Sequence, residues 1–107
     1  MRRIVVTGVG VVTPLGNDVD AFWNRLCAGE SGVQTLTTMD TSLYKVHFGG
    51  EVTEFDLSGL VDPREAKRLD RFTQFAVYAG SRAIEDAGLE FDKTDRGKCG
   101  VILGSGI

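Results

Sequence analysis

Few side chains in this sequence could act as nucleophiles or carry protons. The chain has two cysteines, Cys27 and Cys99, and a single histidine, His47. A reactive thiol needs a neighbouring base or a helix N-terminus to lower its pKa. Cys27 falls at the C-terminal end of a predicted helix and Cys99 in an apolar run, so both are predicted to be small buried hydrophobes. With His47 on a predicted edge strand, we expect no Cys-His-His or Ser-His-Asp set within these residues, and metal-ligand spacing is absent from the sequence.

A pair of glycines, Gly8 and Gly10, opens like the fingerprint of a dinucleotide-binding domain. The position of the third glycine holds Thr13, and the next predicted helix starts several residues later, so no helix N-terminus would meet a pyrophosphate. Glu30, at about the distance of the ribose-binding acid, lies beside a helix stop and not after a second strand. Dinucleotide binding is therefore a remote alternative.

Four cations recur at helical spacing, namely Arg64, Lys67, Arg68 and Arg71. Spacings of i, i+3, i+4 and i+7 place them on one stripe of a helix. An ordinary solvated helix face is one interpretation. The other is an acidic partner, because four like charges within two turns repel one another.

The composition describes one ordinary soluble domain, or a piece of one. In 107 residues, 42% are hydrophobic and 25% charged, and 12 basic against 15 acidic side chains give a net charge of −3. This balance provides no overall attraction for nucleic acid or anionic lipid. No stretch approaches the roughly 20 apolar residues that span a bilayer. Two cysteines are too few for a disulfide framework, so we expect the reducing cytoplasm and neither a nucleic-acid nor a membrane partner.

Two apolar runs predict strands of a parallel sheet. Residues 4–12 and 99–103 are almost continuously apolar, which is typical of strands buried on both faces. Between them, residues 32–60 predict a loop with one or two short edge strands. The order of elements is that of an α/β protein. Two parallel strands make a poor sheet, so we expect these residues to be an N-terminal part of a larger domain.

Two helices are predicted with clear boundaries. The first has Asn17 or Asp18 as its cap and ends at Gly29. The second begins at Asp62 and Pro63 and continues to about Ala87. Its many small residues, including Gly80 in mid-helix, predict deep packing and close approach to another backbone.

Several segments together resemble the start of a β-ketoacyl-acyl carrier protein synthase, and most closely the type II elongating enzymes of bacterial fatty acid synthesis. They include RIVVTGVGVVTPLG over residues 3–16, REAKRLDRFTQFA over 64–76 and GVILGSGI over 100–107. The resemblance implies a thiolase-like α/β fold with αβαβα layers, and a homodimer. Residues 1–107 would form the N-terminal part of the first βαβαβ half, truncated before the nucleophile cysteine.

The resemblance also implies a reaction. In this family an acyl group moves from a carrier protein to a cysteine thiolate, malonyl-carrier protein loses CO₂, and the carbanion attacks the thioester. The cysteine and two histidines of that site would follow residue 107, so no catalytic residue is assigned here, and these residues alone are expected to be inactive. The resemblance implies no cofactor.

The family's roles transfer to two places in this sequence. Arg64, Lys67 and Arg68 coincide with basic residues that engage the acidic acyl carrier protein in elongating synthases. Ile107 coincides with an isoleucine that lines the acyl pocket near the dimer interface. A polyketide ketosynthase and a non-catalytic subunit of the chain-length-factor type are the alternatives to a fatty acid enzyme.

Overall fold

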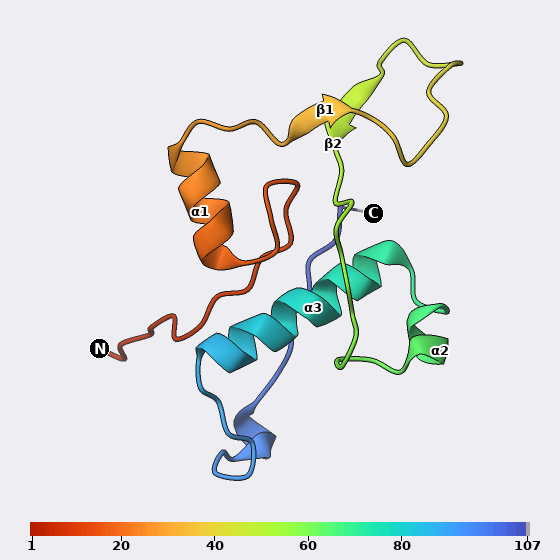
Figure 1. Ribbon diagram of the computed structural model, residues 1–107. Coiled ribbons are helices and arrows are strands. Elements are labelled where there is room, and N and C mark those ends of the chain that lie inside the picture. The colour runs from red at the N-terminus through yellow and green to blue at the C-terminus, as the bar shows by residue number, and fades with distance from the viewer. Residues whose placement is uncertain (107) are drawn as a thin grey trace.

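One long helix crosses the middle of this computed structural model, and the other elements lie around it (Figure 1). The structure describes residues 1–106. In chain order the elements are α1 Val19–Cys27, β1 Val33–Thr35, β2 Phe48–Gly50, α2 Pro63–Ala66, α3 Arg71–Asp86 and the 3₁₀ turn η1 Arg96–Lys98.

Helix α1 has the boundaries that the sequence predicts. The carboxylate of Asp18 accepts a hydrogen bond from the backbone N–H of Ala21 at 2.9 Å and caps the helix. At the other end Gly29 takes a φ of +74°, the left-handed conformation that glycine adopts without strain. The chain then turns toward β1.

The predicted continuous helix from Asp62 to Ala87 is wrong, because the structure divides it into α2 and α3. Asp70 has an extended backbone at the break, with φ −62° and ψ 153°. The side-chain nitrogen of Gln74 donates to the carbonyl oxygens of Ala66 and Leu69, each at 3.0 Å. These bonds satisfy carbonyl groups that a continuous helix would have bonded internally. Asp62 caps α2 as predicted, accepting from the N–H of Arg64 at 2.8 Å.

The predicted close approach of two backbones is confirmed, at alanines of α3. A Cβ added at Gly8 would lie 2.2 Å from the carbonyl oxygen of Ala83, and one added at Gly10 only 2.0 Å from that of Ala79. The two glycines therefore let the extended N-terminal segment lie directly on α3. Gly80 plays no part, because within residues 1–106 a Cβ built there would meet nothing within 4 Å apart from the adjoining backbone of its own helix. Because Gly8 and Gly10 lie against α3, their backbone is not open for a dinucleotide to approach.

The strands predicted for residues 4–12 and 99–103 are wrong for this structure. Ile4 is 93% exposed and Ile102 98% exposed. Within residues 1–106 the sheet is the antiparallel pair of β1 and β2, with Val33 opposite Gly50. A strand requires a neighbouring strand for its hydrogen bonds, and neither apolar segment has one here. The short strands predicted between residues 32 and 60 are confirmed.

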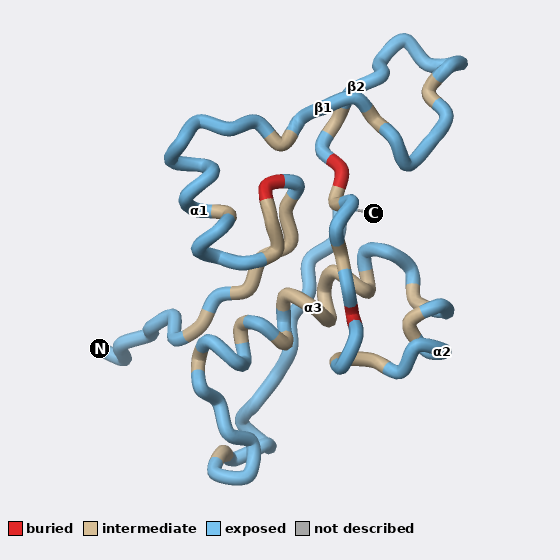
Figure 2. The backbone as a smooth tube through the Cα atoms, viewed as in Figure 1, coloured by how far each residue is buried: buried red, intermediate tan, exposed pale blue. Residues whose placement is uncertain are grey.

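Burial is confined to a few places along the tube in Figure 2. In the described part of the chain the buried residues are Leu15, Leu57 and Glu51. No residue of α3 is fully buried, so the predicted deep packing of this helix is wrong. None of the helices described is long and apolar enough to cross a membrane.

Candidate functional site

Residues 63–69 form an exposed basic segment. Arg64 lies in α2, Lys67 is its C-cap residue, and Arg68 follows, with its N–H bonded to the carbonyl of Glu65 at 2.8 Å. All three basic side chains are exposed. Of the ion pairs formed among residues 1–106, none includes any of the three. The basic segment therefore presents three cations to solvent, and within residues 1–106 none of them is held in an ion pair, although Glu65 lies among them in the sequence.

Arg71 does not belong to this surface, although the sequence places it on the same stripe. Its guanidinium lies 4.8 Å from the ring centre of Phe55 and 5.0 Å from that of Phe75. It also donates to the carbonyl oxygen of Val52 at 2.8 Å. These contacts tether the segment that leads to α2 onto α3. The predicted stripe of four cations thus contains three free ones, because the helix breaks between Arg68 and Arg71.

A pocket of about 220 Å³ lies beside the basic segment. Its lining is mostly apolar and includes Phe55, Leu57, Val61, Pro63, Ala66 and Gln74. The rings of Phe55 and Phe75 meet edge to face at 5.0 Å between centres and support its wall. Two residues of the basic segment, Pro63 and Ala66, therefore line the same pocket as Phe55.

A larger pocket of about 560 Å³ opens between the N-terminal segment and the second half of α3. Acidic residues predominate among its charged groups, which are Asp18, Asp20, Arg82, Glu85 and Asp86. Arg82 lies 5.0 Å from the ring centre of Tyr78 and pairs with Glu85 at 2.7 Å. A side-chain hydrogen bond to Tyr78, followed by the bond and charge of Glu85, raises the pKa of Arg82. The pocket is polar and open.

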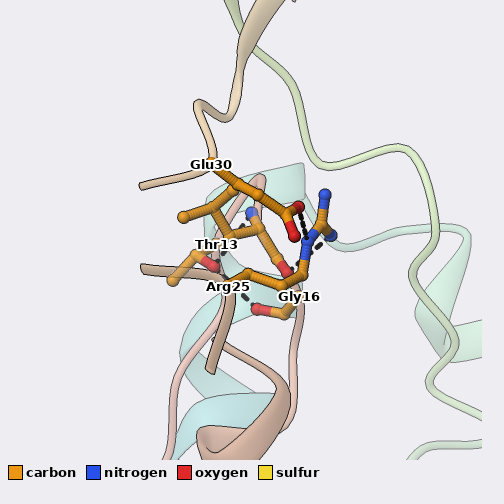
Figure 3. A network of polar contacts seen from close by, with 5 residues as sticks. Thr13, Gly16, Arg25 and Glu30 are labelled. Atoms are coloured by element: carbon orange, nitrogen blue, oxygen red, sulfur yellow. Dashed lines mark hydrogen bonds and ion pairs between the residues drawn. The ribbon is translucent and has the colours of Figure 1, made fainter. Parts of the chain in front are cut away.

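A hydrogen-bonded turn fixes the start of α1 (Figure 3). The hydroxyl of Thr13 donates to the carbonyl oxygen of Gly16 at 2.7 Å and accepts from the N–H of Leu15 at 3.2 Å. Arg25, on α1, donates to the carbonyl of Leu15 at 2.8 Å and to the carboxylate of Glu30 at 2.6 Å. The network holds both ends of α1 against the turn, a role that the spacing of these residues does not reveal.

Glu51, which the sequence analysis did not single out, is the buried carboxylate of the described residues. It accepts hydrogen bonds from the backbone N–H groups of Thr37 and Thr38, at 2.9 and 2.8 Å, and from both hydroxyls. The bonds from Thr38, and then those from Thr37, lower the pKa of Glu51 to about 2. Glu51, directly after β2, thus ties down the loop that leaves β1 as a charged acceptor.

The predicted burial of both cysteines is wrong: Cys27 and Cys99 are exposed. His47 precedes β2, and its Nδ1 lies 3.1 Å from the hydroxyl of Thr41. Across residues 1–106 no group of three or more His, Cys, Asp or Glu side chains could hold a metal ion. Ile107 lies outside the described residues.

Comparison with protein families and curated proteins gives a uniform result. The family described as "Beta-ketoacyl synthase, N-terminal domain" matches residues 1–107. The 3-oxoacyl-[acyl-carrier-protein] synthase 2 of Staphylococcus aureus is 41% identical over 106 residues, or 99% of this chain and 26% of that protein. The protein of the same name from Synechocystis sp. is 43% identical over 106 residues, again 99% of this chain and 26% of that protein.

Solved structures of ketosynthases share the fold. The ishigamide ketosynthase/chain length factor has a TM-score of 0.73 and 33% identity, over 82% of this chain and 22% of that one. A β-ketoacyl synthase from Burkholderia phymatum STM815 has a TM-score of 0.69 and 26% identity, over 88% and 23%. A third structure, a type II PKS acyl-carrier protein in complex with its ketosynthase, has a TM-score of 0.63 and 33% identity, over 88% and 21%.

These matches confirm the α/β, thiolase-like class that the resemblance implies. The chain spans about a quarter of the length of the curated relatives it matches. The matches run through the N-terminal segment, the basic segment and α3 in one alignment that covers nearly all of the chain. This chain belongs to the β-ketoacyl synthase family, and its residues match the N-terminal domain of that family.

Proposed function

We propose that the parent protein of this chain is a 3-oxoacyl-[acyl carrier protein] synthase of fatty acid elongation. The observation that carries the proposal is the 41 to 43% identity, over 99% of the chain, to proteins of that name. The reaction forms a carbon–carbon bond between an acyl group held on an enzyme cysteine and the carbanion released when malonyl-carrier protein loses CO₂. The cysteine thiolate is the leaving group, and residues beyond this chain provide it.

The basic segment docks the acyl carrier protein. The exposure of Arg64, Lys67 and Arg68 supports this role, as does their lack of ion pairs within residues 1–106. Exposed cations that face an acidic partner accelerate association and fix its orientation. A ketosynthase that resembles this chain was solved in complex with its acyl-carrier protein.

Ile107 lines the acyl pocket of the parent enzyme. The proposal rests on the sequence, in which Ile107 follows the Gly104-Ser105-Gly106 turn. Glycines let a backbone crowd a ligand, and a branched apolar side chain beside them would limit the length of the acyl tube.

The chain is the N-terminal part of a synthase domain, and by itself it condenses nothing. In the parent it belongs to a cytoplasmic homodimer. Its cysteines are both free, as is usual for proteins of a reducing compartment. The apolar residues exposed at both of its ends suit a segment that other parts of a larger domain cover.

A second candidate is a polyketide ketosynthase or its chain-length-factor subunit. The TM-score of 0.73 with the ishigamide ketosynthase/chain length factor favours this reading. A chain-length factor can be told apart from a synthase by experiment. It has no nucleophilic cysteine, so it acts only together with a ketosynthase subunit, whereas a synthase condenses by itself.

The test is an assay of the purified full-length parent with acyl- and malonyl-carrier protein. We expect release of CO₂ and formation of one 3-oxoacyl product from the parent alone. Activity that appears only with a second subunit, and yields longer polyketides, would assign the alternative. No condensation under either condition would contradict both.

A further inference from the structure

Gln74, in the first turn of α3, connects the basic segment to the helix behind it. Its side-chain nitrogen donates to the carbonyl oxygen of Ala66 at 3.0 Å and to that of Leu69 at 3.0 Å. An amide group has two N–H donors, so one side chain serves both carbonyls. Gln74 also lines the pocket beside α2 and is half-buried there.

The two carbonyl groups lie on either side of two of the three cations, Lys67 and Arg68. Ala66 directly precedes Lys67, and Leu69 directly follows Arg68. Among the hydrogen bonds described for residues 1–106, these two are the ones in which a side chain of α3 bonds the backbone of the basic segment. The bonds within the segment are local, such as that from the N–H of Leu69 to Ala66 at 3.3 Å. Gln74 therefore fixes how Lys67 and Arg68 stand relative to α3.

We infer that Gln74 is a positioning residue for docking of the acidic carrier protein. The inference rests on the docking function proposed above for Arg64, Lys67 and Arg68. A basic segment that is already ordered loses less conformational freedom when a partner binds, and it presents its charges in one arrangement. Without the two hydrogen bonds the carbonyl of Leu69 turns to water and that of Ala66 keeps only its local bond from the N–H of Leu69. The segment then loses its attachment through Gln74 to α3 and must be ordered at each encounter.

The experiment replaces Gln74 by a neutral side chain of similar length in the full-length parent. Gln74→Met removes both donors without changing the charge. The matched control is Gln34→Met, because Gln34 lies exposed on β1 and its side chain makes none of the described hydrogen bonds. KM and kcat are measured with a carrier-linked acyl substrate and with a small acyl thioester that has no carrier.

For Gln74→Met we expect KM for the carrier-linked substrate to rise by about 3- to 10-fold, the effect of losing one or two modest hydrogen bonds. We expect kcat to remain within about twofold, and the kinetics of the small thioester and of Gln34→Met to be unchanged, because the positioned groups touch only the carrier. If Gln74→Met does not fold, Gln74→Leu tests the same loss of donors.

A coupled variant tests whether Gln74 acts through the cations. The parent that carries Arg64→Glu, Lys67→Glu and Arg68→Glu is compared with and without Gln74→Met. Since the attractive charges that Gln74 positions have been reversed, Gln74→Met should add no further increase in KM in that background. High salt should shrink the effect of Gln74→Met in the wild-type background.

Three results would overturn the inference: an unchanged KM in Gln74→Met, an equal loss with the small thioester, or a full additional loss in the triple background. Failure of the docking proposal itself is distinguishable, because the triple variant would then keep the wild-type KM whatever residue 74 is.

Discussion

Glu51 shows how strongly local hydrogen bonds decide the state of a single side chain. Its carboxylate, directly after β2, accepts hydrogen bonds from Thr37 and Thr38 in the loop that follows β1, and these bonds lower its pKa from the ordinary value of 4.5 to about 2. A carboxyl group whose folded pKa is lowered stabilises the fold above its unfolded pKa. That stabilisation decreases as the pH falls from about 4.5 toward about 2.

The variant Glu51→Gln should therefore remove this pH dependence. An amide has one acceptor oxygen and no charge, so the melting temperature of the parent should drop at neutral pH. The gap between wild type and variant should narrow as the pH falls below about 4.5. Thermal melts at a series of pH values measure the gap, with Glu54→Gln at an exposed neighbouring glutamate as the control. A gap that stays constant down to the lowest pH at which the fold persists would contradict the assignment.

Ile107→Phe tests the proposed acyl pocket. A larger ring beside the Gly104-Ser105-Gly106 turn should overfill the tube, so the parent should lose activity with long acyl chains and keep it with short ones. Rates of cysteine acylation with carrier-linked substrates of increasing length measure the effect. Equal losses for all lengths, with a lower melting temperature, would mean that Ile107 supports the fold instead.

At the scale of elements, local sequence patterns predict where helices begin and end, but contacts between separate segments determine where a helix is interrupted. The helix boundaries at Asp18, Gly29 and Asp62 follow from caps and turns, which involve neighbouring residues, and the sequence predicts them correctly. The break at Asp70 is different. At this break the carbonyl groups of Ala66 and Leu69 accept hydrogen bonds from the side chain of Gln74 in place of the bonds of a continuous helix. The periodicity of the sequence does not predict this replacement.

The candidate site was predictable to the same extent. The exposure of Arg64, Lys67 and Arg68 follows from their spacing, because the charged face of an amphipathic helix faces solvent. Arg71 does not join this surface, because its guanidinium lies over the rings of Phe55 and Phe75. These two rings are far apart in the sequence and come together only in the fold. The bonds of Glu51 to Thr37 and Thr38 likewise cross the hairpin.

The contact of the N-terminal segment with α3 predicts opposite effects for two glycine substitutions. Gly10→Ala would place a methyl group 2.0 Å from the carbonyl oxygen of Ala79. It should cost about 1–3 kcal/mol or more through overpacking. A Cβ at Gly80 would contact no other segment of residues 1–106, so Gly80→Ala should stabilise α3 by up to about 1 kcal/mol. Urea unfolding of the parent measures both. Equal tolerance of the two substitutions would contradict the packing.

For the whole molecule, exposed apolar surface is the dominant feature. Large apolar side chains at both ends of the chain are almost fully exposed, among them Ile4 at 93%, Val101 at 85% and Ile102 at 98%. Strands with such sequences are normally covered on both faces. The sequence pattern identifies them as strand-forming, but their pairing depends on partners that residues 1–106 do not provide.

The 107-residue chain should therefore bind a hydrophobic dye and aggregate when it is purified alone, and it should melt without cooperativity. It should also form no 3-oxoacyl product from acyl- and malonyl-carrier protein. Dye fluorescence and calorimetry test the first expectation, and product analysis tests the second, with the full-length parent as the control. Turnover by the isolated chain, or a sharp calorimetric transition, would contradict this picture.

Docking of an acidic carrier protein on the basic segment is the central claim, and one measurement tests it most directly. In the full-length parent, Arg64→Glu, Lys67→Glu and Arg68→Glu are combined, and KM for a carrier-linked acyl substrate is measured at low and at high salt. The reversed charges should repel the carrier, so KM should rise by about tenfold or more at low salt. High salt should shrink the difference, and a small thioester should be unaffected. A triple variant with the wild-type KM at low salt would contradict the claim.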